Sequence, residues 1–351
     1  MIKKIFYILF VLVLLISACQ PTANDVRTLT IITHDSFSVS AELVSGFEEE
    51  NNVRLVFIQG GDTGSALNRL ILTSVNSKTP EADVFYGLDN TFLSRALEQN
   101  LFEPYQPEGL ENIPDEFKLD PEFFVVPIDF GDVCINYDRA YFSERNIELP
   151  RSLQDLTKPE YEGLLVVENP ATSSPGLAFM LATIAEFGED AWLDWWQAMK
   201  VNQVAIVSDW ETAYYNNFSG SSGKGPQPMV VSYASSPAAE LIYAETALSE
   251  SPTASLIAPG MCWRQVEFAG ILNNTPNRDL AEKFIDFLLS KEFQEDMPMQ
   301  MFVFPVLPAA ELPEDFITAS QLPETVSSLN SALIAAHRDA WINEWANLML
   351  K

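Results

Sequence analysis

A long run of extended chain at residues 125–138, VVPIDFGDVCINYD, constrains the fold more than any other feature of the sequence. It carries no helical signal between its two halves, so it predicts a strand that crosses from one lobe to another. Residues 259–270, PGMCWRQVEFAG, are also extended and predict a return crossing. Two lobes fit a chain of 351 residues, because a single hydrophobic core stops growing at roughly 250–300 residues.

Short apolar runs alternate with stretches of helical periodicity around these crossings. Residues 28–33 and 53–58 read as strands, and residues 41–50 between them place apolar side chains at helical spacing. A second series starts at residues 164–167. Strand–helix–strand units of this kind predict an α/β fold with parallel strands.

Later helices are predicted from their apolar spacing. Residues 279–295 show one amphipathic pattern, and residues 327–349 are expected to form a last helix. Trp192, Trp195 and Trp196 fall on a further helix. We expect these three tryptophans to pack in the core rather than contact a ligand.

Two aromatic residues stand where buried strands should end. Trp210 comes soon after the apolar run 204–207, and Tyr233 follows residues 229–232. Ligands bind at the carboxyl ends of strands in open α/β sheets, and two aromatic faces there suit a flat, cationic molecule. The alternative is that both are ordinary core residues, and their positions alone leave the two interpretations open.

Polar loops are predicted at the same edge of the sheet. Residues 59–65, QGGDTGS, form a glycine-rich turn before a helix, but they lack the spacing of a nucleotide-binding motif. After the strand at residues 164–167, Ser174 is the expected N-cap of a helix and Pro175 its first residue. Such a helix start can bind an anion, although a simple capped helix gives the same pattern.

The first residues have the composition of an export signal. Two lysines precede an apolar stretch at residues 5–15 that is too short to remain as a membrane span. The stretch ends in ISAC at residues 16–19, which resembles the bacterial lipobox. We therefore expect residues 1–18 to be a lipoprotein signal peptide, Cys19 to be lipidated and residues 19–27 to be a tether. An ordinary secretory signal with an incidental cysteine is the alternative.

The net charge excludes one class of partner. The chain carries −29 at pH 7, and residues 1–18 contain two lysines and no acidic residue, so the remainder carries about −31. Nucleic acid is not expected as a partner, because phosphate binding needs basic patches. The same charge repels anionic lipid, so a lipid on Cys19 is the expected route to the membrane.

The remaining chemistry-bearing residues are few. Cys134 and Cys262 lie in the two predicted crossings. They could form a disulfide or remain two buried thiols, and the sequence does not favour either alternative. The two histidines, His34 and His337, are too few for a zinc site, and no metal is expected. No hydrolase, nucleotide-binding or redox motif occurs, so we do not expect an enzyme.

Ten short motifs share their order with a known family. They are THDSF at 33–37, LNRL at 67–70, GLDN at 87–90, VPIDFG at 126–131, TSSPG at 172–176, WETAY at 210–214, SYASSPA at 232–238, QVE at 265–267, FPV at 304–306 and RDAWINEW at 338–345. Through them the chain resembles the substrate-binding components of ABC importers, in the subfamily that binds thiamine.

The resemblance implies a type II periplasmic-binding-protein fold, in which two α/β lobes joined by crossing hinge strands close over a ligand. With the crossings above, it places lobe 1 at residues 28–130 and 266–351 and lobe 2 at residues 131–265. It also implies an exported monomer without a cofactor, which delivers thiamine or its phosphates to the membrane subunits of an ABC permease. Its lipid would hold it at the outer face of the cytoplasmic membrane or in the periplasm.

The resemblance also implies site residues. The family's aromatic clamp falls on Trp210 and Tyr233. A tryptophan of its C-terminal loop is replaced by Phe302, and its first-strand tyrosine is replaced by His34. The identity of the ligand depends on these two replacements, because both stand at expected ring contacts.

Polar residues complete the expected site. The family's helix start, linked to a hydroxyl or phosphate tail, falls on Ser173 and Ser174. Thiamine carries a permanent thiazolium charge and an aminopyrimidine, and carboxylates can pair with either. Among the acidic residues at strand ends, we rank Asp35 and Asp62 first.

Several other functions remain open from the sequence. A sibling of the same fold could bind ferric iron or a polyamine. Iron would need converging tyrosine oxygens, and the adjacent Tyr214 and Tyr215 are the only hint of them. An enzyme that makes a thiamine precursor on the same fold has no use for an export signal, and an adhesion protein has no use for the aromatic clamp.

Overall fold

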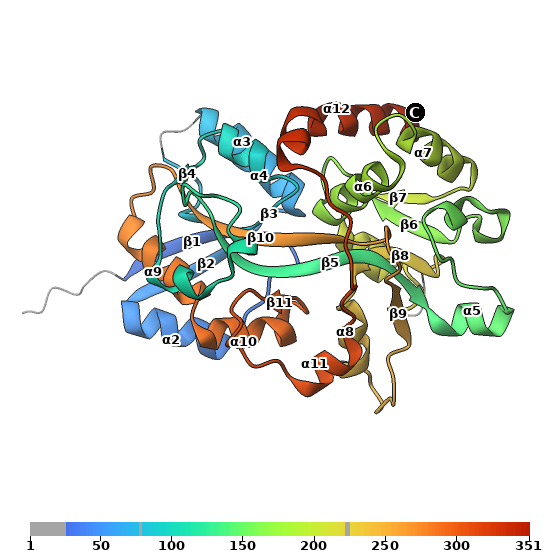
Figure 1. The fold of residues 1–351 in the computed structure, drawn as a ribbon. Coiled ribbons are helices and arrows are strands. Elements are labelled where there is room, and N and C mark those ends of the chain that lie inside the picture. The colour runs from blue at the N-terminus through green and yellow to red at the C-terminus, as the bar shows by residue number, and fades with distance from the viewer. Residues whose placement is uncertain (1–25, 77–78, 222–224) are drawn as a thin grey trace, which may run out of the picture.

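The computed structural model describes residues 26–76, 79–221 and 225–351. The predicted signal peptide, tether start and lipidation site at Cys19 lie outside these residues. One mixed sheet runs through the molecule in the order β2-β1-β3-β10-β5-β8-β6-β7, with β4, β9 and β11 paired beside this path. The predicted α/β class is confirmed, and helices cover both faces of the sheet (Figure 1).

The first lobe is built on parallel strands. β1 (Arg27–Thr33) pairs with β2 (Val53–Gln59) and with β3 (Val84–Asp89). All residues of β3 are buried, and β1 is buried from Leu29 onward except for Thr30, which is intermediate. The helices that connect and extend them are α2 (Ala41–Asn51), α3 (Thr63–Asn76) and α4 (Leu93–Glu98), and β4 (Phe102–Glu103) pairs with β10.

Two long antiparallel strands cross between the lobes (Figure 1). β5 (Val126–Asp138) and β10 (Trp263–Leu272) pair from Trp263 opposite Val133 to Ala269 opposite Val126. Both match the crossings predicted from the sequence. β5 continues into the second lobe, where it pairs with β8 and β9.

The second lobe repeats the strand–helix alternation. β6 (Leu165–Glu168) lies between β7 (Ala205–Val207) and β8 (Met229–Tyr233), and all three are parallel. The other elements are α5 (Arg139–Arg145), α6 (Ser174–Phe187), α7 (Trp192–Val201), α8 (Ser236–Ile242) and β9 (Thr253–Leu256). Trp192, Trp195 and Trp196 are buried on α7, which confirms their predicted core position.

The single helix predicted at residues 279–295 is wrong. The chain instead forms α9 (Arg278–Leu288) and α10 (Lys291–Gln300). Ser290 has extended backbone dihedrals and its side chain accepts a hydrogen bond from Phe293 N, so it ends one helix and caps the next. The sequence pattern did not show this break, because the apolar residues of both helices face the same core.

The last part of the chain returns to the second lobe. β11 (Phe304–Pro305) pairs with β5, and α11 (Glu314–Ala319) packs against α8. The final helix α12 (Ser331–Met349) lies over both lobes: Lys200 Nζ donates to Leu348 O at 2.6 Å, and Arg338 Nη1 donates to Ser94 Oγ at 2.9 Å. The boundaries expected for the two lobes remain a prediction.

Cys134 of β5 and Cys262, just before β10, form a disulfide whose Cα atoms are 4.3 Å apart. The bond joins residues 128 positions apart in sequence. It ties the two crossing strands to each other where they enter the second lobe.

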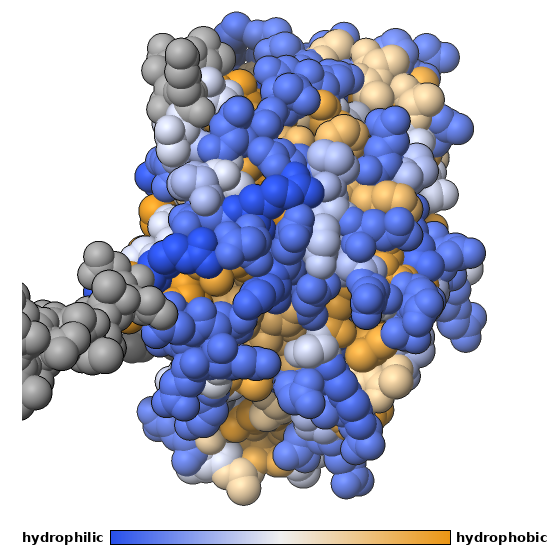
Figure 2. Space-filling model, turned by 90° about the vertical axis from the view of Figure 1, so that its left-hand side faces the viewer, coloured by the Kyte–Doolittle hydropathy of each residue, from blue (hydrophilic) through white to orange (hydrophobic). Residues whose placement is uncertain are grey.

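The outer face of the first lobe is mostly hydrophilic, and hydrophobic side chains show only in small groups between polar ones (Figure 2). This surface fits the large excess of acidic residues in the sequence. None of the helices in residues 26–76, 79–221 and 225–351 combines the length and apolar composition needed to cross a bilayer.

Candidate functional site

A cavity of about 190 Å³ lies where the two lobes meet, at the carboxyl ends of the parallel strands. Its lining comes from the loops after β1, β2 and β7, the π-helical turn at Thr212–Asn217, the first residues of α3 and α6, the end of β8, α8, β10, and the end of α10 with the turn after it. The lining residues are His34, Asp35, Ser36, Asp62, Thr63, Ser174, Pro175, Asp209, Trp210, Glu211, Tyr214, Tyr215, Tyr233, Ser236, Ala239, Tyr243, Glu267, Gln300, Met301, Phe302 and Val303. Both lobes therefore contribute to one site.

Seven of the eight residues predicted to bind a ligand line this cavity: His34, Asp35, Asp62, Ser174, Trp210, Tyr233 and Phe302. Ser173 does not. It is fully buried, and its Oγ accepts a hydrogen bond from Gly176 N at 3.4 Å. Ser173 is therefore the N-cap of α6, which corrects the cap expected at Ser174. The ligand contacts themselves stay predictions.

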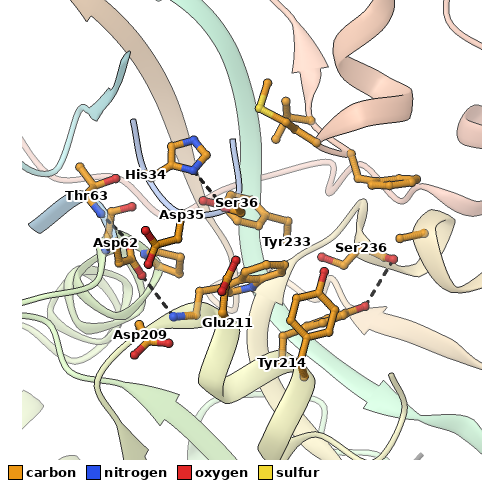
Figure 3. Close-up of a pocket in the computed structure, with 18 of the residues that line it drawn as sticks. His34, Asp35, Ser36, Asp62, Thr63, Asp209, Glu211, Tyr214, Tyr233 and Ser236 are labelled. Atoms are coloured by element: carbon orange, nitrogen blue, oxygen red, sulfur yellow. Dashed lines mark hydrogen bonds between the residues drawn. The ribbon is translucent and has the colours of Figure 1, made fainter. Parts of the chain in front are cut away.

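Carboxylates gather on one side of the cavity and tyrosines on the other (Figure 3). In that view Asp35, Asp62, Asp209 and Glu211 face Tyr214 and Tyr233. Glu267 of β10 also lines the cavity. None of the lining residues, all within the described part of the chain, is a lysine or an arginine. This charge distribution favours a cationic ligand.

Asp62 joins the two lobes. It stands at the start of α3 in the first lobe and accepts hydrogen bonds from two backbone N–H groups of the second lobe, Ser174 N at 3.3 Å and Trp210 N at 3.2 Å. Close by, Ser65 N donates to Thr172 O at 3.1 Å. A Cβ on Gly64 would lie 2.8 Å from the Thr172 carbonyl carbon, so glycine is required for this approach. The two lobes are therefore in direct contact beside the cavity, through Asp62 and Ser65 of the first lobe.

Trp210 is held firmly by its neighbours. Its ring stacks on Tyr214 with centroids 4.9 Å apart, and its Nε1 donates to Ser232 Oγ at 2.9 Å. Because Tyr214 covers one face, only the opposite face of Trp210 is available to a ligand. The rings of Trp210 and Tyr233 are 6.4 Å apart and inclined by 62°. They therefore do not form a parallel slot, and a flat group that stacks on one ring would meet the other ring at an angle.

Phe302 closes the cavity from the turn after α10. Its backbone has a φ of 57°, and its carbonyl accepts a hydrogen bond from Ser235 Oγ at 2.5 Å. Its ring meets Tyr243 edge to face, with centroids 5.5 Å apart. Tyr243 also donates from its hydroxyl to Met299 O at 3.0 Å. These contacts tie α8 of the second lobe to the turn after α10.

His34 packs tightly at the floor of the site. Its Nδ1 lies 3.0 Å from Ser36 Oγ (Figure 3), and its Nε2 lies 3.5 Å from Glu267 Oε2. Gly87, at a φ of 96°, makes room for the ring, because a Cβ there would lie 2.3 Å from His34 Cδ2. Burial opposes protonation of His34, but the nearby carboxylates of Glu267, Asp62 and Asp35 outweigh it and raise its pKa above 6.5.

Further buried carboxyl groups lie below the cavity on the crossing strands and β3. Asp129 of β5 stands opposite Glu267 of β10 and accepts a hydrogen bond from the Tyr86 hydroxyl. Burial, with the negative charge of Glu267, raises the pKa of Asp129 well above its usual value. Burial also raises the pKa of Asp89 to about 6. The floor of the site therefore holds acids that take up protons at unusually high pH.

Some lining residues were missed in the sequence. Asp209 and Glu211 flank Trp210, so their position after a strand was a usable signal. Tyr215 follows Tyr214 in a π-helical turn at Thr212–Asn217, which the spacing of apolar residues does not show. Tyr243 stands at the end of α8, and only the return of the chain through residues 301–303 brings it to the cavity.

The site does not resemble a metal centre. Within the residues that the structure describes, no group of three or more His, Cys, Asp or Glu side chains is arranged to hold a metal ion. Tyr214 donates its hydroxyl to Glu240 Oε1 at 2.9 Å and is buried. Burial raises its pKa well above 10, which disfavours a phenolate.

Comparison with known sequences places the chain among binding proteins. The sequence pattern of the bacterial extracellular solute-binding proteins matches residues 79–321. The thiamine-binding periplasmic protein of Salmonella typhimurium is 31% identical over 339 residues, which cover 94% of this chain and 96% of that protein. The protein of the same description from Escherichia coli is 31% identical over 336 residues, covering 94% and 96%.

Solved structures share the fold. A periplasmic thiamin-binding protein matches with a TM-score of 0.79 and 28% identity, covering 94% of this chain and 98% of that one. The periplasmic protein AfuA of Actinobacillus pleuropneumoniae, with fructose-6-phosphate bound, matches with a TM-score of 0.78 and 22% identity, covering 93% and 99%. Iron-bound HitA of Pseudomonas aeruginosa matches with a TM-score of 0.71 and 20% identity, covering 91% and 99%. The last two matches are evidence for the fold alone.

Proposed function

The chain belongs to the family of bacterial extracellular solute-binding proteins, and on this premise we propose that it binds thiamine between its lobes and delivers it to an ABC permease. One observation carries the proposal. The cavity combines several carboxylates with the rings of Trp210 and Tyr233 and has no lysine or arginine in its lining, all of which the structure describes. Thiamine is a cation with two aromatic rings, a thiazolium and an aminopyrimidine, and such a cation is stabilised by aromatic faces and by carboxylates.

The two relatives from Salmonella typhimurium and Escherichia coli, each 31% identical over 94% of this chain, support the same ligand. Both are described as thiamine-binding periplasmic proteins. They are binding proteins, and we propose that this chain likewise carries out no catalytic step and needs no cofactor. We also propose that it acts as a monomer and that a lipid on Cys19 holds it at the membrane.

Ferric iron is the alternative suggested by other relatives, one of which is iron uptake protein A1 of Synechocystis. Iron(III) sites in this fold would need ionised tyrosine oxygens. Burial raises the pKa of Tyr214 and of Tyr233 well above 10, and the Tyr214 hydroxyl is already bonded to Glu240. The cavity therefore supports an organic cation better than iron.

The proposal is tested by following tryptophan fluorescence of the purified protein during titration with thiamine, spermidine and ferric citrate. We expect saturable quenching with thiamine and none with ferric citrate, because a ligand on the free face of Trp210 changes the environment of its indole. A response to spermidine or ferric citrate without one to thiamine would move the function to a sibling of the same fold.

Thiamine affinity is expected to fall on acidification, roughly threefold to tenfold between pH 7.5 and 5.5. His34, whose pKa is raised above 6.5, gains positive charge as the pH falls through its pKa. Burial raises the pKa values of Asp62 and Glu211, so these carboxylates lose negative charge in the same direction. Each change makes the cavity less favourable for a cation.

Calorimetric titrations at several pH values measure this dependence. His34→Phe keeps a ring at the position but does not titrate, so it should show a shallower decline than the wild-type protein. An affinity that stays constant over the range would contradict a role for these groups at the ligand.

A further inference from the structure

Tyr214 supports the ring of Trp210 from one side. The two rings are stacked, with centroids 4.9 Å apart and planes inclined by 20°. Tyr214 is only 1% exposed, and it belongs to a buried cluster with Val166, Phe218 and Val230, against which Trp210 packs. The indole therefore rests on a ring that is itself enclosed by the core of the second lobe.

The orientation of the Tyr214 ring depends on its hydroxyl group. The hydroxyl donates to Glu240 Oε1 at 2.9 Å, and Ser236 O is a more distant acceptor at 3.5 Å (Figure 3). Burial raises the pKa of Tyr214 well above 10, so the phenol keeps its proton and remains a donor. Because a buried hydroxyl without a good acceptor is unfavourable, the Glu240 carboxylate determines where the end of this ring lies.

Glu240 itself lies outside the cavity. It belongs to α8, 26 positions beyond Tyr214 in the sequence, and the lining residues, all of which the structure describes, do not include it. Burial raises the pKa of Glu240, whereas the hydrogen bond from Tyr214 lowers it by stabilising the carboxylate. Glu240 can therefore act on a bound ligand only through the rings of Tyr214 and Trp210.

The edge of the indole is fixed separately. Trp210 Nε1 donates to Ser232 Oγ at 2.9 Å. A hydrogen bond at one atom leaves the ring free to tilt about that atom, so the stack on Tyr214 is the contact that sets the plane of the indole. The hydrogen bond to Glu240 thus determines how firmly this plane is held.

We propose that Glu240 is a positioning residue for ligand binding: through the Tyr214 hydroxyl it fixes the plane of the Trp210 indole on which thiamine lies. This role rests on the proposed function and adds to it a residue that the ligand does not touch. A cation is attracted most strongly when it lies over the face of an aromatic ring. A ring that is already held in place loses less conformational freedom when the ligand binds.

The experiment is calorimetric titration of the purified protein and its variants with thiamine. Glu240→Ala removes the acceptor, and we expect it to weaken binding at least about tenfold. Glu240→Gln retains an oxygen that can accept from Tyr214, so its affinity should recover to within about threefold of the wild type. A merely structural loss would not separate these two variants once thermal unfolding verifies that both are folded.

A second pair of variants tests the route through Tyr214. Tyr214→Phe keeps the stacked ring and removes the hydroxyl, so it should weaken binding at least about fivefold. Adding Glu240→Ala to Tyr214→Phe should weaken binding by less than about twofold more, because the two residues act through one hydrogen bond. Tyr214→Phe also tests the proposed role if Glu240→Ala does not fold.

The chain offers a matched control away from the cavity. Tyr105 donates its hydroxyl to Asp286 Oδ2 at 2.8 Å, and neither residue is in the cavity lining, which lies wholly within the described part of the chain. Asp286→Ala breaks the same kind of hydrogen bond without affecting Trp210. It should therefore leave thiamine affinity as it is.

Four results would overturn the role of Glu240. They are wild-type affinity in Glu240→Ala or Tyr214→Phe, equal losses in Glu240→Gln and Glu240→Ala, additive losses in the double variant, and a comparable loss in Asp286→Ala. Each of them leaves the proposed function intact, because the wild type still binds thiamine. If the wild type does not bind thiamine, the proposed function is wrong and the role of Glu240 fails with it.

Discussion

Trp210→Ala should weaken thiamine binding by at least about a hundredfold, or about 2.7 kcal/mol. The substitution removes the one indole face that is open to the ligand, and a cation on an aromatic face gains about 0.5–2 kcal/mol beyond the apolar area it buries. It also removes the hydrogen bond from Nε1 to Ser232 Oγ and leaves Tyr214 without its stacking partner. Calorimetry measures the loss directly.

Two control variants separate stacking from general damage. Trp210→Phe keeps an aromatic face but loses the bond to Ser232, so its affinity should lie between those of the wild type and Trp210→Ala. Trp341→Phe changes a tryptophan of α12 outside the cavity lining and should leave the affinity as it is. Wild-type affinity in Trp210→Ala would mean that the ligand does not lie on this ring.

The sequence predicted those parts of the fold that depend on the burial pattern within a single segment of the chain. Both faces of β5 and β10 are mostly buried, so both segments read as extended chain without helical periodicity. The predicted range of β5 begins one residue early, and that of β10 begins four residues early and ends two residues early. The break between α9 and α10 was missed, because the cap at Ser290 interrupts the backbone without interrupting the apolar face. The path of residues 301–330 was missed as well, since it depends on contacts with β5 and α8 that are remote in sequence.

The site was predictable to the extent that strand ends meet at one edge of a sheet. This rule brings His34, Trp210 and Tyr233 to one cavity from three separate strands. The role of Asp62 at the start of α6 was not predictable, because it depends on how closely the two lobes approach each other. Sequence patterns predict the elements of each lobe, but they do not predict how closely the two lobes approach each other.

The second large effect is expected on stability. Replacing Cys134 and Cys262 together by alanine should lower the free energy of unfolding by about 3 kcal/mol, since removal of a native disulfide typically costs about 2–5 kcal/mol. The bond closes a long loop, because its cysteines are 128 positions apart in the sequence. Its loss therefore allows the unfolded chain many more conformations. Denaturant unfolding of the wild type and the double variant measures the difference.

Because of its location, we expect removal of this disulfide to lower stability without weakening thiamine binding. Neither cysteine lines the described cavity, and both are buried with Ala234 in a small cluster of their own. Thiamine affinity of the folded double variant should therefore stay within about threefold of the wild type. Reductant added to the wild type should reproduce the stability loss and have no effect on the double variant. Equal stability of the two proteins, or two reactive thiols from Cys134 and Cys262 in denatured, unreduced wild type, would show that the crossing strands are held together by pairing and packing alone.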